Sequence, residues 1–319
     1  MSFTVVTPTF RPDLALCRRL NRSVLEYCSP SVVHHILVPD EDVAAFASLR
    51  GPRCTVWPES AFLPRRIRRL ARLHPVAQRL GYRGPRIAAV NVRRPYPPVR
   101  GWILQQVLKF AAAREIGERV VVLVDSDVEL VRPLSPSALV RSDGVVRLYR
   151  ADGAIDDRLP RHVMWHDVAR ALLGLPHTPT PLPDYISSLN VWDRQLVVAL
   201  QDRIEHVTGR PWVDALAAQV HFSEWTLYGV FVDAVAGAPA NSFRSSSTLC
   251  HSYWDTTPLD RASAADFAAR CPEEAVGVLI QSKSGTPLEV RTAALRLFAD
   301  RLAASRLPID SDAEIRAAD

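Results

Sequence analysis

The chain has 319 residues, of which 48% are hydrophobic and 23% are charged. This is the composition of an ordinary globular protein. The length is long for one hydrophobic core and short for two full domains, which favours one large domain with insertions or a domain with a smaller lobe. No run approaches the roughly 18 apolar residues of a transmembrane helix. We therefore expect no membrane span, while peripheral membrane contact stays open.

The net charge is +5 and the isoelectric point is about 9.1. Lys109 and Lys283 are the only two lysines, so the basic residues are almost all arginines. The arginines are dispersed and no nucleic-acid module is recognisable, so we expect no nucleic-acid partner. A mildly basic protein suits an anionic nucleotide. The five cysteines are odd in number and lack CxxC spacing, which favours a reducing compartment. The N-terminus does not have the pattern of a signal peptide. We therefore expect a cytoplasmic protein.

The first 60 residues alternate between apolar runs and segments of helical periodicity, which is typical of a parallel sheet with helices on its faces. Residues 64–100 break this pattern, and their Arg- and Pro-rich composition predicts a solvated amphipathic helix followed by an irregular connection. A docking face for an anionic acceptor or a membrane surface is the alternative for this segment. In chain order we expect strands at 3–8, 34–40, 53–60, 120–124, 144–150, 248–255 and 276–281, and helices at 12–28, 40–50, 101–116, 193–208, 221–235 and 288–307.

The run VVVLVDSDVELVRP (120–133) predicts a buried strand that ends in carboxylates. Side chains two apart on a strand point the same way, so Asp125 and Asp127 face together at its carboxyl end, where open parallel sheets bind ligands. Two adjacent carboxylates favour Mg²⁺ or Mn²⁺, which prefer oxygen ligands. The alternative is that Asp125 caps a turn and Asp127 pairs with Arg132 or another arginine.

On these features the chain resembles the bacterial GT-A type nucleotide-sugar glycosyltransferases of the DxD superfamily, over about residues 3–255. The resemblance rests on three stretches: VVTPTF, VVVLVDSDVEL and LCHSYWD. It implies an α/β fold with a GT-A-like, Rossmann-type, mostly parallel sheet flanked by helices and a smaller C-terminal acceptor-side portion. The expected layout is one catalytic domain at 1–310, with a nucleotide-binding half at 1–140, an acceptor-side half at 141–310, and a frayed tail at 311–319.

The resemblance also implies an activity and a set of site residues. The activity is metal-dependent transfer of a sugar, with hexosyl transfer favoured, from a nucleoside-diphosphate sugar to a hydroxyl acceptor. A UDP-sugar is the favoured donor, and Mn²⁺ or Mg²⁺ is the expected cofactor. The implied metal ligands are Asp125, Asp127 and His251. The implied donor-binding residues are Thr7, Pro8, Thr9, Phe10, Asp40, Gln106, Lys109, Asp125, Ser126, Asn190 and Lys283.

Two carboxylates are candidates for catalysis. Glu224 lies between Phe222 and Trp225, and burial among aromatic rings would raise the pKa of its carboxyl group, as suits a general base. Asp193 is implied as a catalytic residue near the donor sugar. Both also have ordinary structural interpretations: Asp193 can cap the helix that follows it, and Glu224 can sit at a helix N-terminus capped by Ser223. His251 can equally be a core or surface histidine.

Two other functions stay open. A phosphohydrolase of the haloacid dehalogenase type also places DxD after an apolar strand and would use Asp125 as its nucleophile. That pattern prefers Thr or Val where this chain has Glu129, and it usually lies near the N-terminus. A non-catalytic GT-A-like protein that binds a nucleotide or a partner is the third possibility. The sequence names no sugar, no acceptor and no stereochemical course.

Overall fold

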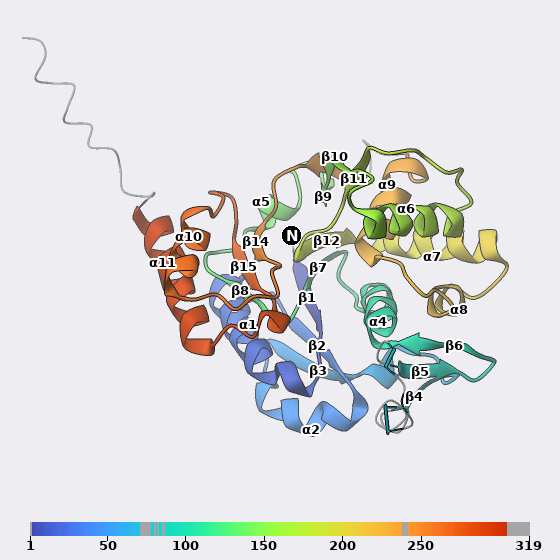
Figure 1. Cartoon of the computed structure of the whole chain (residues 1–319), viewed down its shortest axis with the longest axis horizontal. Coiled ribbons are helices and arrows are strands. Elements are labelled where there is room, and N and C mark those ends of the chain that lie inside the picture. The colour runs from blue at the N-terminus through green and yellow to red at the C-terminus, as the bar shows by residue number, and fades with distance from the viewer. Residues whose placement is uncertain are drawn as a thin grey trace, which may run out of the picture.

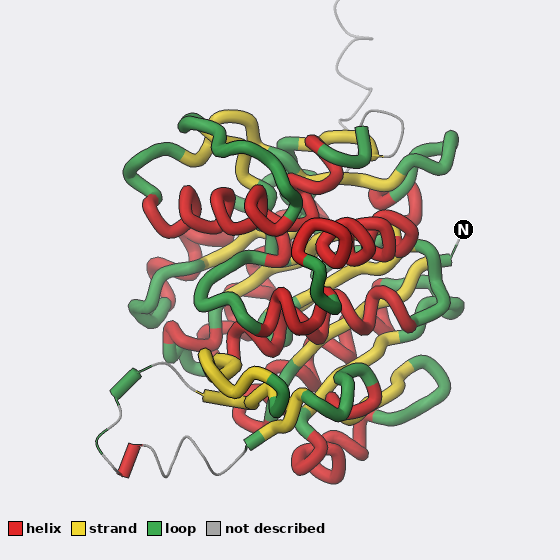
Figure 2. Tube along the Cα trace, turned by 90° about the vertical axis from the view of Figure 1, so that its right-hand side faces the viewer, coloured by secondary structure: helices red, strands yellow, loops and turns green. Residues whose placement is uncertain are grey.

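The computed structural model describes residues 2–70, 78–79, 81, 83–84, 87–237 and 242–304. Its central sheet has five strands in the order β12-β7-β1-β2-β3, and only the edge strand β12 runs antiparallel to its neighbour. Helices cover both faces of this sheet (Figure 1, Figure 2). The expected α/β class with a mostly parallel sheet is confirmed. The strands are β1 (Phe3–Pro8), β2 (His34–Val38), β3 (Cys54–Pro58), β7 (Val120–Val124) and β12 (Leu189–Asp193).

The interior strand β7, between β12 and β1, is uniformly apolar because both of its faces are covered. Val121 and Leu123 belong to the hydrophobic core on the side of helix α4 (Gly101–Glu115). The alternate residues, Val120, Val122 and Val124, belong to the core on the side of helix α1 (Leu14–Tyr27). This alternation leaves the two aspartates that follow as the first polar residues at the end of β7.

Long and short helices complete the layers. The expected helix at 40–50 is three short pieces instead, η2 (Asp40–Asp42), α2 (Val43–Phe46) and η3 (Ala47–Leu49). The helix predicted at 101–116 ends one residue earlier, at Glu115. The remaining helices are α5 (Pro136–Leu139), α6 (Pro160–Leu172), α7 (Arg194–Thr208), α8 (Trp212–Ala217), α9 (Glu224–Ala234), α10 (Arg261–Ala269) and α11 (Leu288–Ala304). Within the described residues, no helix is long and apolar enough to cross a bilayer.

The segment at 64–100 differs from the prediction where it is described. It contributes β4 (Ile67–Arg69), β5 (Ile87–Asn91) and β6 (Arg94–Arg100), which form a separate antiparallel sheet. Buried Ile67, Ala89 and Val99 anchor this sheet to the core beside α4. The Arg- and Pro-rich composition of this segment did not indicate the few apolar positions that these strands bury. Residues 71–77 and the expected frayed tail at 311–319 lie outside the described residues.

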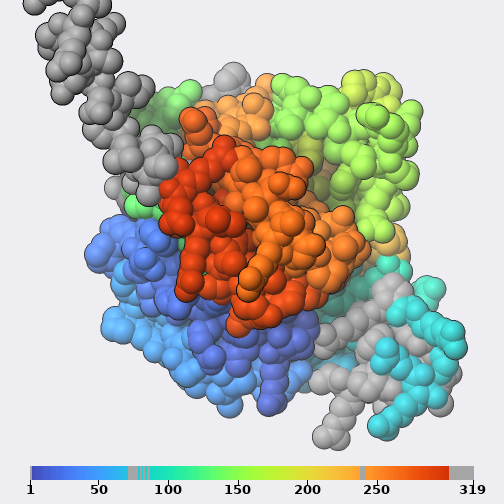
Figure 3. All heavy atoms as spheres, turned by 60° about the vertical axis from the view of Figure 1, so that its left-hand side comes forward, coloured from blue at the N-terminus to red at the C-terminus, as the bar shows by residue number. Residues whose placement is uncertain are grey.

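The C-terminal segments form a unit on one side of the central sheet. β8 (Val128–Leu130), β15 (Gly277–Ile280) and β14 (Cys250–Tyr253) make a three-stranded sheet, with β15 in the middle. Helices α10 and α11 pack on it, and Figure 3 shows this red and orange mass against the blue N-terminal part. Two small sheets pair β9 (Val146–Tyr149) with β13 (Ser242–Ser245), and β10 (Ala151–Ile155) with β11 (Leu182–Asp184).

Candidate functional site

The candidate site begins in the short connection between β7 and β8. Asp125, Ser126 and Asp127 fill this connection, at the carboxyl end of β7 and beside the carboxyl end of its parallel neighbour β1. Parallel sheets bind ligands at this edge. The Asp125 side chain keeps 28% of its surface exposed, and Asp127 is half-buried. Both carboxylates can therefore be reached from solvent.

A buried lysine holds the first of these carboxylates. Lys109 Nζ lies 2.9 Å from Asp125 Oδ1 and 2.7 Å from Glu224 Oε1, and its side chain is only 4% exposed. The ammonium also lies 4.2 Å from the centroid of the Trp225 ring, a cation–π distance. Three segments far apart in the sequence, α4, the β7–β8 connection and the start of α9, thus meet at one cation.

Burial and charge set the protonation of this group. Burial alone would lower the pKa of Lys109, but Asp125 and Glu224 together raise it above its ordinary value, so the lysine is an ammonium ion at neutral pH. Burial raises the pKa of Glu224, and the adjacent Lys109 partly offsets this. Glu224 is therefore buried, as expected from the sequence, and it has a partner, Lys109, that the sequence did not reveal.

Asp127 is in a different electrostatic position. Burial, and then the nearby Asp125, raise the pKa of its carboxyl group to about 6. Its Oδ2 accepts a hydrogen bond from the Ser282 backbone N–H at 2.7 Å. In the described part of the chain no basic side chain forms an ion pair with it. The pair therefore consists of one carboxylate in an ion pair with Lys109 and one without an ion pair, which Arg291 influences only through its charge.

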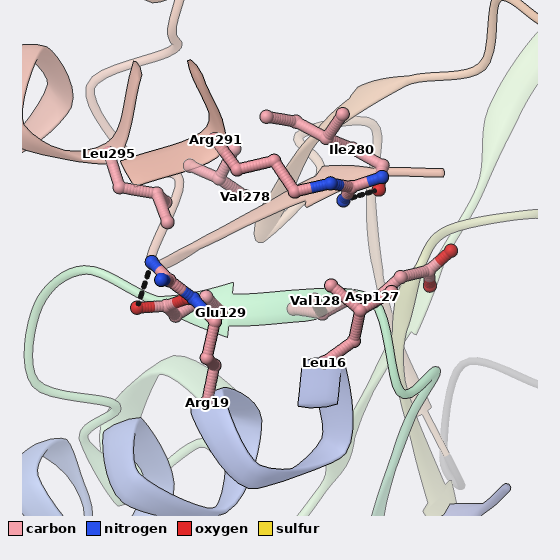
Figure 4. Close-up of a pocket in the computed structure, with 9 residues that line it drawn as sticks. All are labelled: Leu16, Arg19, Asp127, Val128, Glu129, Val278, Ile280, Arg291 and Leu295. Atoms are coloured by element: carbon pink, nitrogen blue, oxygen red, sulfur yellow. Dashed lines mark hydrogen bonds and ion pairs between the residues drawn. The ribbon is translucent and has the colours of Figure 1, made fainter. Parts of the chain in front are cut away.

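The turn that contacts Asp127 is braced from behind by Arg291. This buried guanidinium donates to the backbone carbonyls of Ile280 and Gln281, just before Ser282. Figure 4 shows the small pocket behind the site, where Arg291 reaches toward Ile280, the Arg19–Glu129 ion pair closes one end, and the Asp127 carboxylate points away. The Asp127 carboxylate is therefore directed away from this pocket.

Two further charges lie near the pair. The Ser126 hydroxyl lies 3.5 Å from Asp13 Oδ2, and burial is the main cause of the raised pKa of Asp13. Lys283 is exposed next to Ser282 and is close enough to lower the pKa of Asp13. The sequence analysis selected Lys283 but missed Asp13. The position of Asp13, shortly after the loop that follows the first strand, could have indicated it.

Most of the residues expected to grip the nucleoside are in or near β1, but Thr7 faces inward. Its hydroxyl lies 3.0 Å from His34 Nε2, and His34 Nδ1 lies 2.9 Å from Asn21 Oδ1. Burial lowers the pKa of His34 to about 3, so this chain of hydrogen bonds is neutral. Thr9 differs, because its hydroxyl is buried without a hydrogen-bond partner among the described residues.

Other expected donor residues have identifiable local roles. The Pro8 carbonyl accepts a hydrogen bond from Gln105 Nε2 at 3.3 Å, and Phe10 precedes the short helix η1 (Arg11–Asp13). Asp40 is exposed and accepts hydrogen bonds from Ser60, beyond the end of β3. Its carboxylate is thus used to hold a turn rather than directed at the aspartate pair.

Two amide side chains are buried in the wall of the site. Gln106 is 1% exposed, and its Oε1 accepts a hydrogen bond from the Glu224 backbone N–H at 2.8 Å, which fixes the start of α9 against α4. Asn190 donates to the Ser187 carbonyl at 2.9 Å and so shapes the entry into β12. Gln106 was predicted to face the donor, and the structure directs it to Glu224 instead.

The structure separates Asp193 and His251 from the aspartate pair. Asp193 pairs in register with Val120, at the opposite end of β7 from Asp125, and there caps α7 through Gln195 and binds Arg119. The contacts of Asp193 are therefore those of a helix cap, the structural interpretation given from the sequence.

The His251 ring stacks on the Phe267 ring, with 4.2 Å between the ring centroids, and His251 Nε2 lies 3.0 Å from the Phe267 carbonyl oxygen. Strand alternation explains this placement: on β14 the neighbour Ser252 reaches Ser188 at 2.7 Å, so His251 points to the opposite face, toward α10. Across the residues that the structure describes, no group of three His, Cys, Asp or Glu side chains is arranged to hold a metal ion. The five cysteines are free and buried.

Residues 4–296 match the family described as "Family of unknown function (DUF6492)", and the chain belongs to this family. No curated protein matches the sequence. Among solved structures, the chain is similar to mouse xyloside xylosyltransferase 1 in its apo form. The identity is 14%, the TM-score is 0.44, and the match covers 90% of this chain and 100% of the mouse chain.

Proposed function

We propose that this protein is a glycosyltransferase that moves a sugar from a nucleoside-diphosphate sugar to a hydroxyl acceptor. The observation that carries the proposal is the aspartate pair at the carboxyl ends of β7 and β1, where Asp127 forms no ion pair within the described structure. Ligand binding at this edge is the rule for open parallel sheets. The dispersed basic residues and the exposed Lys283 suit an anionic donor.

The aspartate pair fits a divalent cation, Mn²⁺ or Mg²⁺. Mg²⁺ is usually held by one or two carboxylates together with waters and substrate phosphates, so a third protein ligand is not required. Asp127 would be the main ligand, because Lys109 already neutralises Asp125. A bound cation would lower the pKa of Asp127 and would neutralise charge on the diphosphate leaving group. His251 stays a predicted ligand, although its present contacts are with α10.

The other residues of the site are assigned from their positions. Lys283 would contact a phosphate oxygen, and the backbone of residues 7–10 with the unpartnered Thr9 hydroxyl would contact the nucleoside. The favoured donor is a UDP-sugar and the favoured group a hexosyl unit, both carried over from the resemblance. Glu224 stays a predicted general base. Its 2.7 Å contact with Lys109 favours a second role, in which it orients Lys109 and through it Asp125.

Isothermal titration calorimetry of nucleoside diphosphates and nucleotide sugars tests the proposal. The titrations compare the wild-type protein with Mn²⁺, the wild-type protein with a chelator, and Asp127→Ala with Mn²⁺. Asp300→Asn, on the exposed face of α11, is the matched control. We expect one nucleotide to bind only with metal, with binding lost in Asp127→Ala and kept in Asp300→Asn.

The absence of nucleotide binding in every metal condition would refute the proposal. Release of phosphate from simple phosphate esters, lost in Asp125→Asn, would instead support a phosphohydrolase. Metal-dependent nucleotide binding with no sugar transfer and no hydrolysis of the donor would identify a nucleotide-binding protein without turnover.

A further inference from the structure

A cluster of aromatic rings lies at the start of α4, away from the aspartate pair. The Trp102 and Trp165 ring centroids are 5.4 Å apart, and those of His162 and Trp165 are 4.7 Å apart. Trp165 is 8% exposed, whereas Trp102 keeps 41% of its surface in solvent. We call these three residues the aromatic cluster. It joins α4 to α6, and its outer ring is exposed.

The aromatic cluster holds polar atoms without partners. Four buried side-chain polar atoms lack a hydrogen-bond partner in the described structure, and two of them are His162 Nδ1 and Trp165 Nε1. Buried polar atoms are nearly always paired, and leaving one unpaired is costly, so each exception calls for an explanation. Two such exceptions in adjacent rings point to a ligand as the missing hydrogen-bond partner, although both atoms are enclosed in this structure and the rings must shift to admit one.

The aromatic cluster is connected to the proposed catalytic site along one face of α4. Trp102, Gln106 and Lys109 are spaced i, i+4 and i+7, so they follow one stripe of the helix. Seven residues span about 10 Å along the axis. Gln106 contacts the start of α9, and Lys109 contacts Asp125, so the stripe leads from the aromatic cluster to the aspartate pair. The aromatic cluster therefore lies about 10 Å along the α4 axis from the lysine that contacts Asp125.

We propose that the aromatic cluster binds a sugar ring of the acceptor. An exposed indole offers a flat apolar face for the C–H face of a pyranose, while an indole N–H and an imidazole nitrogen offer polar contacts for its hydroxyl groups. This combination suits a ligand that is apolar on its face and hydroxylated at its edge. The identification of this sugar as the acceptor rests on the proposed function. The further inference adds that the acceptor is a glycan or glycoside.

The test compares carbohydrate binding by the wild-type protein with that of two variants. Trp102→Ala removes the exposed ring, and His162→Phe keeps a flat ring but removes the unpaired nitrogen. Tyr96→Ala is the matched control, because Tyr96 is 88% exposed on β6, shortly before α4, and lies outside the aromatic cluster. The probe is an array of immobilised pyranose oligosaccharides, followed by saturation-transfer NMR with the glycans that bind.

We expect Trp102→Ala to weaken glycan binding about two- to tenfold, the scale of one aromatic contact, and Tyr96→Ala to leave it unchanged. His162→Phe should weaken binding without lowering Tm, because it removes an unpaired polar atom; a purely structural histidine would lower Tm and leave binding intact. With a bound glycan as acceptor, Trp102→Ala should raise the acceptor KM while donor hydrolysis is unchanged.

Equal binding by the wild-type protein and Trp102→Ala, or no glycan bound by either, would overturn the proposal. The proposed function is judged separately by metal-dependent nucleotide binding, which does not involve the aromatic cluster. Nucleotide binding without any glycan binding that depends on Trp102 would therefore refute only the acceptor subsite. Glycan binding that depends on Trp102, in a protein that binds no nucleotide, would refute the proposed glycosyltransferase activity. The protein would then be a carbohydrate-binding protein.

Discussion

Replacing Asp127 with Asn should stabilise the metal-free protein at neutral pH. The pKa of Asp127 is about 6 in the folded protein against 3.8 as the reference value. The difference, 6 − 3.8, is about 2 pKa units, or about 3 kcal/mol at about 1.4 kcal/mol per unit. Since Asp127 is half-buried, solvent screening reduces the expected gain to about 1–2 kcal/mol. An Asn side-chain oxygen can still accept the Ser282 N–H hydrogen bond.

The sign of the pH dependence follows from linkage. A carboxyl group whose folded pKa is raised contributes most to stability below its unfolded pKa, and that contribution is lost as the pH rises through the folded pKa. The advantage of Asp127→Asn should therefore be near zero at about pH 4 and should grow to its full size above about pH 6. A ligand residue that costs stability in the empty protein is typical of functional sites.

Urea unfolding of both proteins with a chelator present, at about pH 4.5 and about pH 7.5, measures this difference. A second pair of experiments adds Mn²⁺ with a nucleoside diphosphate, which should stabilise the wild-type protein and leave Asp127→Asn unchanged. If Asp127→Asn is less stable than the wild type by the same amount at both pH values, the reasoning is refuted. Asp127 would then be a structural hydrogen-bond acceptor rather than an uncompensated charge.

Three further changes test the framework of the site. Lys109→Met should cost about 3–5 kcal/mol in urea unfolding, because it leaves two carboxylates without their cation; addition of Glu224→Gln should recover part of that loss, and no recovery would contradict the buried pair. Gly229→Ala should cost about 1–3 kcal/mol in the same assay, since a Cβ there would lie 2.2 Å from the Tyr185 ring. His251→Ala should lower stability by about 1–2 kcal/mol and keep metal-dependent nucleotide binding in calorimetry; loss of that binding with the fold intact would restore His251 as a metal ligand.

Local patterns predicted the central architecture well. The apolar run at 120–124 was expected to be a strand buried on both faces, and β7 alternates its side chains between two cores. The alternation of strands and helices before residue 60 also gave the parallel order of β1, β2 and β3. These features depend on the hydrophobic periodicity and the composition of short segments, and both can be read from a single sequence.

The environment of individual site residues depended on contacts that periodicity does not encode. Nothing near Glu224 in the sequence indicates Lys109, because the two residues are 115 positions apart. The orientation of His251 depends on which face of β14 packs against α10, and the motif LCHSYWD does not specify that face. Asp193 was selected from a resemblance, whereas the register of β12 on β7 places it at the far end of the sheet.

The use of lysine at position 109 can be understood from its contacts. The chain has 39 basic residues, of which only two are lysines, so arginine is the residue to expect at a buried ion pair. An ammonium ion is compact and can direct its donors to two carboxylates while it lies over the Trp225 ring; a planar guanidinium has a fixed fork better suited to one carboxylate. Because Glu224 begins α9 and Asp125 directly follows β7, this single cation joins the β7–β8 connection to the start of α9. The position of Asp125 in the proposed donor site is therefore coupled through Lys109 to the docking of α9.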